Sequence, residues 1–138
     1  MVLTVDSVKL YELPYIVEEN GDLVIMEAAD LPFAIARVFV VRAETDAVRG
    51  CHAHKACSQF LTCPQGKLEV LCDDGENTKQ FSLDQPNLGL YIPAGIWASQ
   101  KYEEPNSVLT VLCDLPFDES DYIRFYGDYL AYRREPIV

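Results

Sequence analysis

Short segments of β-strand character, separated by turn residues, run along most of the 138-residue chain. Many of them alternate apolar and polar residues, and Pro, Gly, Asn and Asp separate them about every ten residues. The expected strands cover residues 7–13, 23–27, 35–41, 51–55, 58–63, 67–72, 78–82, 89–92 and 108–113. The segment 35–41 is rich in β-branched and aromatic residues and is expected to be well buried. Several short strands at this spacing favour an all-β sandwich or barrel.

The last part of the chain departs from this pattern. Aromatic residues between positions 120 and 134 recur at helical spacing, and Ser120 precedes them as an N-cap, so we expect a short C-terminal helical segment. The aromatic stripe consists of Tyr122, Phe125, Tyr126 and Tyr129 and is interpreted as packing rather than as a ligand site. Neither an internal repeat nor a linker interrupts the sequence, which indicates a single domain over residues 1–138.

Composition indicates a folded protein and argues against some classes of partner. Hydrophobic residues make up 49% of the chain and charged residues 24%. A domain of this length buries roughly two-thirds of the surface of its unfolded chain, so it needs no disulfide or structural metal. The formal charge of −11 repels phosphate backbones and anionic lipids, which argues against nucleic acid and membrane partners. No apolar run approaches the roughly 20 residues of a membrane span, and the N-terminus does not resemble a signal peptide, so we expect a cytoplasmic protein.

The five cysteines indicate a reducing compartment. Their number is odd and no two are spaced as Cys-x-x-Cys, so neither a disulfide framework nor a zinc site is expected. Cys51 and Cys57 flank the histidines described next, but nothing beside them points to an activated nucleophile. We expect free thiols.

Both histidines of the chain lie in the segment RGCHAHK at residues 49–55. Residues two apart on a strand point to the same face, so His52 and His54 are expected to project side by side. Neutral imidazoles can either ligate a metal or transfer protons. Two histidines on a solvated face remain the structural alternative.

The spacing around this pair resembles the first metal-binding motif of cupins, which are small double-stranded β-helix barrels of the jelly-roll class. His52 and His54 match that motif, whereas Gln59 stands at its Glu position. The segment PAGIWA keeps the Pro and Gly of the second cupin motif, but Ala98 stands where the last ligand His belongs. A histidine pair and a neutral amide would hold a divalent ion weakly, so we expect a cupin barrel without a metal.

Proton transfer is therefore the favoured role of the pair. An imidazole with a pKa of about 6.5 can take and return a proton at neutral pH. Arg37, Arg49 and Lys55 lie nearby in the sequence and could bind a phosphate-bearing substrate, although strict alternation turns Lys55 away from the histidine face. Ion pairs with some of the 22 carboxylates are the alternative role of these cations.

Taken together, the motifs resemble one known family. The segments IARVFVV, RGCHAHK, LGLYIPAGIW and FDESDYIRFY are similar to those of the sugar-nucleotide 3,4-ketoisomerases, and the likeness runs from Gly21 to Tyr129. These enzymes are metal-free cupins that act on dTDP-4-keto-6-deoxyglucose. The resemblance implies no cofactor, a homodimer that often exchanges N-terminal strands, and conversion of the 4-keto sugar into its 3-keto isomer.

The resemblance also implies roles for the candidate residues. His52 would be the base that removes the C3 proton, which the adjacent ketone acidifies, and His54 would move or stabilise protons on the two oxygens. The expected substrate contacts are Arg37, Arg49, Gln59 and Trp97. The arginines would hold the pyrophosphate or the sugar oxygens. Gln59 and Trp97 would line the barrel, with a place in the core as the alternative for Trp97.

The sequence departs from the family pattern in three places. Family members commonly carry RVYY where this chain has RVFV, so a tyrosine hydroxyl is missing at Phe39, and Tyr91 or a water could replace it. They also often have His at the position of Ala98 and Arg at the position of Asn20. Members differ in the face on which C4 is reprotonated, and we favour the galacto product.

Two other functions stay open from the sequence. A related cupin epimerase, or a metal cupin, would use the same barrel, and an epimerase would keep its carbonyl at C4. A non-catalytic barrel that binds a sugar nucleotide would make no demand on a base.

Overall fold

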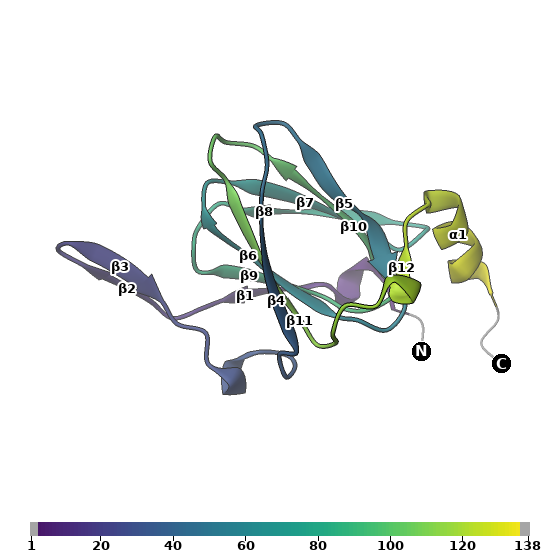
Figure 1. Cartoon of the computed structure of the whole chain (residues 1–138), viewed down its shortest axis with the longest axis horizontal. Helices are drawn as coiled ribbons and strands as arrows, with labels where there is room; N and C mark the ends of the chain where they lie inside the picture. Colours follow the sequence, from purple (N-terminus) through teal and green to yellow (C-terminus); the bar gives the residue numbers. More distant parts are fainter. Residues whose placement is uncertain (1–2, 136–138) are drawn as a thin grey trace.

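The computed structural model describes residues 3–135 of the protein. Within these residues the strands form two five-stranded antiparallel sheets, which face each other across the core, and a separate two-stranded hairpin (Figure 1). A short helix follows the last strand at the C-terminal end. The structure confirms the expected all-β barrel of the jelly-roll class with a short C-terminal helical segment.

The two sheets contain strands from distant parts of the sequence. In spatial order, the first sheet consists of β1 (Lys9–Glu12), β9 (Leu88–Ile92), β6 (Gln59–Gln65), β11 (Val108–Cys113) and β4 (Arg37–Arg42). The second consists of β12 (Tyr122–Ile123), β5 (Val48–His54), β10 (Trp97–Tyr102), β7 (Leu68–Asp73) and β8 (Thr78–Leu83). The hairpin consists of β2 (Tyr15–Glu18) and β3 (Gly21–Val24), and the helices are η1 (Val5–Ser7), η2 (Ala28–Asp30), η3 (Glu119–Asp121) and α1 (Tyr126–Arg134). None of these described helices is both long and apolar enough to cross a bilayer.

Strand β4 shows how the core is divided from the surface. Successive residues of a strand point to opposite faces, so Phe39 and Val41 pack against the core while Val38 and Val40 point outward. Val38 is 55% exposed and Val40 is 60% exposed. The expectation that segment 35–41 is well buried is therefore wrong for its outer face. β4 is one of the two edge strands of its sheet, and the outer face of β4 stays largely uncovered within the described residues.

Strand β10 was missed by the sequence pattern. Its inward residues, Ala98, Gln100 and Tyr102, are buried, but only one of them is large, so the apolar alternation is weak. The strand nevertheless pairs with β5 on one side and β7 on the other. Hydrogen bonding to both neighbours, rather than intrinsic β-propensity, therefore accounts for this strand.

The C-terminal helix α1 begins at Tyr126 rather than near Ser120. Asp118 caps the preceding 3₁₀ turn by accepting a hydrogen bond from the Ser120 backbone N–H at 3.0 Å. Strand β12 then pairs with β5, and this pairing removes its residues from the helix. The helix packs on the outer face of the second sheet, where the fully buried Tyr129 places its hydroxyl 2.8 Å from the Gly95 carbonyl oxygen.

The turn between β6 and β7 leads to a prediction about stability. Gly66 has a φ of +88°, and a Cβ added there would lie 2.6 Å from the Ser107 Cα atom. We expect Gly66→Ala to lower the free energy of unfolding by about 2 kcal/mol, because it combines positive φ with a backbone clash. Urea denaturation followed by circular dichroism measures this change. Gly21→Ala is the control, since an added Cβ there meets nothing within 4 Å, and equal stability of the two variants would contradict the prediction.

Candidate active site

A cavity of about 240 Å³ lies between the two sheets. Strands β4, β6 and β11 of the first sheet and β5, β10 and β12 of the second contribute to its walls. Its apolar lining consists of Phe39, Val41, Leu61, Leu109 and Val111, and its polar lining includes Arg49, His52, Gln59, Gln100, Tyr102, Tyr122 and Arg124. A concave space in which apolar walls meet convergent polar groups is typical of a site for a small molecule, and the polar groups are numerous here.

A β-bulge in β5 brings Arg49 and His52 to the same cavity. His52 pairs with Ala98 and Arg49 pairs with Gln100, so three steps along β5 match two steps along β10. The extra residue lies near Gly50, which has a φ of +67° and where an added Cβ would clash with the Gln100 side chain. Without the bulge, residues three apart would point to opposite faces. The bulge therefore places Arg49 on the same face of β5 as His52.

His52 points into this cavity and is partly buried. Its ring centroid lies 4.9 Å from that of His54 and 5.0 Å from that of Tyr122. Burial, together with the neighbouring charges of His54 and Arg124, lowers the pKa of His52 to about 4. At neutral pH the imidazole is therefore uncharged and can accept a proton.

The carboxylate of Asp121 sets the tautomer of His54. Its Oδ2 lies 3.1 Å from His54 Nδ1 and accepts a hydrogen bond from the Cys57 backbone N–H, while Oδ1 accepts one from the Ala56 backbone N–H. Because a carboxylate only accepts, Nδ1 carries the proton and Nε2 is left as an acceptor. Burial lowers the pKa of His54, although the hydrogen bond to Asp121 opposes this shift. Nε2 is buried without a hydrogen-bond partner among residues 3–135.

His54 lies deeper in the barrel than His52. It borders a small void of about 10 Å³ together with Gln59, Ala98 and Gln100. His52 borders both this void and the larger cavity, whereas the lining described for the larger cavity does not include His54. The two predicted catalytic imidazoles are thus adjacent, but they are not equally accessible to a substrate.

The predicted substrate contacts Arg37 and Gln59 meet at the thiol of Cys113. Arg37 Nη2 lies 3.5 Å from Cys113 Sγ and 3.2 Å from the Tyr122 hydroxyl oxygen, and Gln59 Nε2 lies 3.7 Å from the same sulfur. Gln59 lines the cavity, as expected, whereas Arg37 lies behind Tyr122 and is not among the described lining residues. Its Nε is buried without a partner in the described part of the chain.

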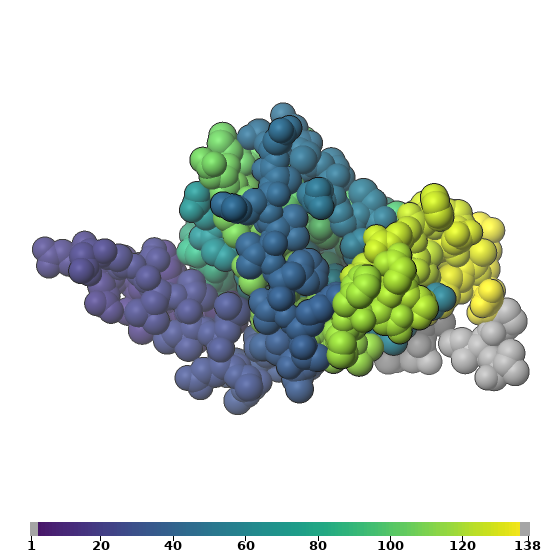
Figure 2. Space-filling model, viewed as in Figure 1, coloured from purple at the N-terminus to yellow at the C-terminus, as the bar shows by residue number. Residues whose placement is uncertain are grey.

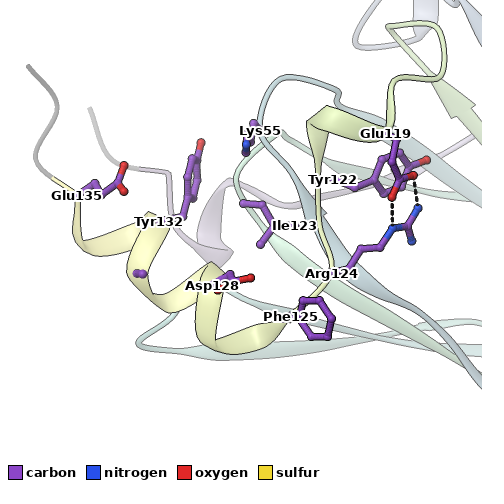
Figure 3. Close-up of a pocket in the computed structure, with 10 residues that line it drawn as sticks. Lys55, Glu119, Tyr122, Ile123, Arg124, Phe125, Asp128, Tyr132 and Glu135 are labelled. Carbon is purple, nitrogen blue, oxygen red and sulfur yellow. Dashed lines mark hydrogen bonds and ion pairs between the residues drawn. The ribbon is translucent and has the colours of Figure 1, made fainter.

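Arg124 is a second cation at the cavity that the sequence analysis did not select. Its guanidinium forms two hydrogen bonds with the Glu119 carboxylate, at 2.7 and 2.8 Å, and lies over the Tyr122 ring with 4.3 Å between Cζ and the ring centroid. Figure 3 shows this pair at the edge of an outer groove of about 520 Å³, which Lys55 and Tyr132 also line. The groove and the cavity share Tyr122 and Arg124, so the two spaces are adjacent.

Trp97 and Tyr91 do not reach the cavity. Trp97 lies on the outer face of β10, with its ring centroid 5.3 Å from that of Tyr126 and 5.6 Å from that of Tyr129. The expectation that Trp97 lines the barrel is therefore wrong, because the alternation of β10 turns it toward α1, and the packing alternative holds. Tyr91 packs against Phe33 in a separate cluster, so it does not supply the hydroxyl missing at Phe39.

The donor set beside the histidines does not fit a metal centre. His54, Cys57 and Asp121 have potential ligand atoms within 4.8 Å of one another in the described structure. However, His54 Nδ1 is already bound to Asp121, and burial raises the pKa of the Cys57 thiol to about 12, so the thiol stays protonated. At the last cupin ligand position the Ala98 side chain carries no donor atom. All five cysteines are free, as expected.

Comparisons with known proteins agree with this geometry. Residues 6–134 match the family model described as FdtA, WxcM-like, C-terminal. The chain is 35% identical over 126 residues to a TDP-4-oxo-6-deoxy-α-D-glucose 3,4-oxoisomerase of Aneurinibacillus thermoaerophilus, covering 90% of this chain and 91% of that enzyme. A 3,4-ketoisomerase structure from Helicobacter canadensis matches with a TM-score of 0.87 and 30% identity over 93% of this chain and 98% of that one. The sugar 3,4-ketoisomerase from Thermoanaerobacterium thermosaccharolyticum, solved in complex with TDP, matches with a TM-score of 0.87 and 32% identity over 92% and 94% of the two chains.

The barrel, its cavity with a neutral imidazole, and these matches define a class of protein. The protein is an isomerase of the sugar 3,4-ketoisomerase class. The chain belongs to the FdtA, WxcM-like, C-terminal family.

The burial of His52 predicts its titration. We expect its ring-proton NMR signals to keep neutral-imidazole shifts from pH 8 down to pH 5 and to titrate with a midpoint of about 4. The physical reason is that the charged form loses hydration in the barrel. His52→Asn and His54→Asn assign the two sets of signals. A midpoint of about 6.5 for His52, the value of an exposed imidazole, would contradict this description of the site.

Proposed function

We propose that the protein converts dTDP-4-keto-6-deoxy-D-glucose into the galacto form of dTDP-3-keto-6-deoxyhexose. The reaction would take place in the cytoplasm, as a step toward a 3-amino-3,6-dideoxysugar of a surface glycan. The observation that carries the proposal is His52, a neutral imidazole at a cavity between the sheets, in a chain 35% identical to an oxoisomerase named for this substrate. The TDP bound in the structure of a relative supports the choice of nucleotide.

His52 serves as the base that acts on carbon. The C4 ketone acidifies the proton on C3, and removal of that proton gives an enediol. The imidazole then returns the proton to C4 as the carbonyl forms at C3. One group can do both because it is uncharged at neutral pH and returns to that state after each turnover.

His54 helps to move or stabilise the protons on the two sugar oxygens. The hydrogen bond to Asp121 keeps the proton of His54 on Nδ1. The other ring nitrogen, Nε2, has no partner in the described residues and is available as an acceptor. His54 borders only the small void, so it acts together with a group that reaches the larger cavity. Its ring is 4.3 Å from that of Tyr122, measured between centroids.

Arg49 and Gln59 contact the substrate in this proposal. Arg49 lines the cavity and is exposed, so it can pair with the pyrophosphate without losing a partner inside the protein. Gln59 is buried and offers its amide to a sugar oxygen. Arg37 acts on the substrate through Tyr122, whose hydroxyl it contacts.

The reaction can be followed by proton NMR of the purified protein with dTDP-4-keto-6-deoxyglucose in D₂O. We expect loss of the C3 proton signal, entry of deuterium and a 3-keto product whose C4 coupling reports the galacto configuration. His52→Asn should reduce turnover by at least about 10³-fold and leave TDP affinity within a few-fold, because it removes the base and preserves most of the side-chain volume. Full activity of this variant would remove His52 from the mechanism.

The same spectra separate the other functions. Deuterium entry at C3 and C5 with the carbonyl still at C4 would indicate an epimerase. Binding of TDP without any exchange would indicate a non-catalytic barrel. Either result would overturn the proposed isomerisation.

We also propose that the protein is a homodimer in which the N-terminal hairpin packs against the partner, with the exchange of N-terminal strands that the family resemblance implies. Figures 1 and 2 show the hairpin β2–β3 extending away from the barrel. Its exposed apolar side chains include Ile16, Val17 and Leu23, and Val17 is 71% exposed. Together with Val38 and Val40 on the edge strand β4, these side chains would lose their contact with water in a dimer.

Light scattering tests the dimer. We expect the protein to have twice the 15.6 kDa mass of the chain, and Val17→Asp to weaken dimer formation at least tenfold, because it would bury an unpaired carboxylate. Leu71→Asp is the control, since Leu71 is an exposed apolar residue on β7, away from the hairpin. A monomeric mass for the wild-type protein would contradict the proposal.

A further inference from the structure

The hydroxyl of Tyr122 lies where the proposed reaction needs a proton donor. Tyr122 is opposite His54 in the pairing of β12 with β5, and both rings point to the same side of the sheet. The phenol ring packs against both imidazoles, with centroid distances of 5.0 Å to His52 and 4.3 Å to His54. Unlike His54, Tyr122 also lines the larger cavity. It is therefore a proton-carrying side chain that a substrate beside His52 can touch.

Arg37 orients the phenol for this role. Its Nη2 donates to the Tyr122 oxygen at 3.2 Å, so the phenol uses that oxygen as an acceptor and keeps its own proton for another partner. A guanidinium also stabilises negative charge that develops on the oxygen when the proton leaves. The cation is held over the Phe39 and Phe117 rings, at 5.1 and 5.4 Å from their centroids. Arg37 is thus a positioning residue for the phenol.

The other hydroxyls near the barrel are less suitable. Phe39 lines the cavity without a hydroxyl, and Tyr91 packs in a separate cluster. Tyr102 also lines the cavity, and its buried hydroxyl has no partner within residues 3–135. However, Tyr102 lies at the Arg49 end of β5, and Tyr122 is the tyrosine in described ring contact with both imidazoles.

We propose that Tyr122 is the group with which His54 acts: it is a catalytic acid and base that touches the sugar oxygens and carries a proton between them, with the His54 ring packed against it, while His52 carries a proton between the two carbons. This inference rests on the proposed function. As His52 takes the proton from C3, the C4 carbonyl oxygen takes the phenol proton, which gives the enediol and a phenolate beside Arg37. The phenolate then removes the proton from the C3 hydroxyl, the carbonyl forms at C3, and His52 returns its proton to C4. Both side chains recover their starting state, and no electrons are gained or lost.

Tyr122→Phe tests the role because it removes only the hydroxyl. We expect kcat to fall at least about 10²-fold and deuterium entry at C3 to slow by a similar factor, since enolisation needs a proton on the C4 oxygen. The Kd for TDP and the melting temperature should stay close to the wild-type values. Tyr126→Phe is the matched control, because its hydroxyl donates to Asp73 outside the cavity, and it should keep wild-type activity.

The outcomes separate this inference from the proposed function. If wild type isomerises the sugar and Tyr122→Phe keeps kcat within threefold, Tyr122 is not the acid and only this inference is overturned. If the variant loses activity together with TDP binding or thermal stability, the hydroxyl has a structural role and the inference is again overturned. If the wild-type protein itself does not isomerise the sugar, the proposed function is overturned, and this inference is overturned with it.

Discussion

The arrangement of the site depends on the hydrogen bonds accepted by the Asp121 carboxylate. Its two oxygens accept from the backbone N–H groups of Ala56 and Cys57 and from His54 Nδ1, so they bind the C-terminal segment to the end of β5. A partly buried carboxylate without such donors would be costly, which makes this geometry specific. The contact holds β12 in register beside β5 and so places Tyr122 between the imidazoles and Arg37. The Asp121 carboxylate therefore fixes the tautomer of His54, the placement of β12 and the position of the Tyr122 phenol.

Burial, rather than the net charge, determines the protonation of the histidines. A chain with a formal charge of −11 would by itself favour cationic imidazoles. Exposed charges are screened beyond about 8–10 Å at physiological ionic strength, whereas loss of hydration acts directly on the buried ring. Desolvation is the largest cause of the lowered pKa of both His52 and His54. The acidic surface and the neutral imidazoles are therefore compatible.

Much of the barrel could be predicted from local patterns. The expected strand at 108–113 agrees with β11, and every other expected strand overlaps an observed one, because period-two alternation depends on neighbouring residues. Strand β10 could not be predicted in this way, since its inward positions include Ala98 and Gln100. The start of the C-terminal helix was wrong for a related reason: helical spacing of aromatic residues was outweighed by pairing with β5. Trp97, expected in the barrel, packs against that helix.

The sequence by itself determined the all-β class, the adjacent imidazoles, the free thiols and, through resemblance, the family. These properties depend on residue types and on spacings of a few positions. The tertiary structure decided which groups meet at the cavity. Asp121 is 67 residues from His54, and Arg49 joins the histidine face only because β5 carries a bulge against β10. Such contacts follow from hydrogen bonding and packing between distant segments, so they cannot be predicted from the local periodicity of the sequence.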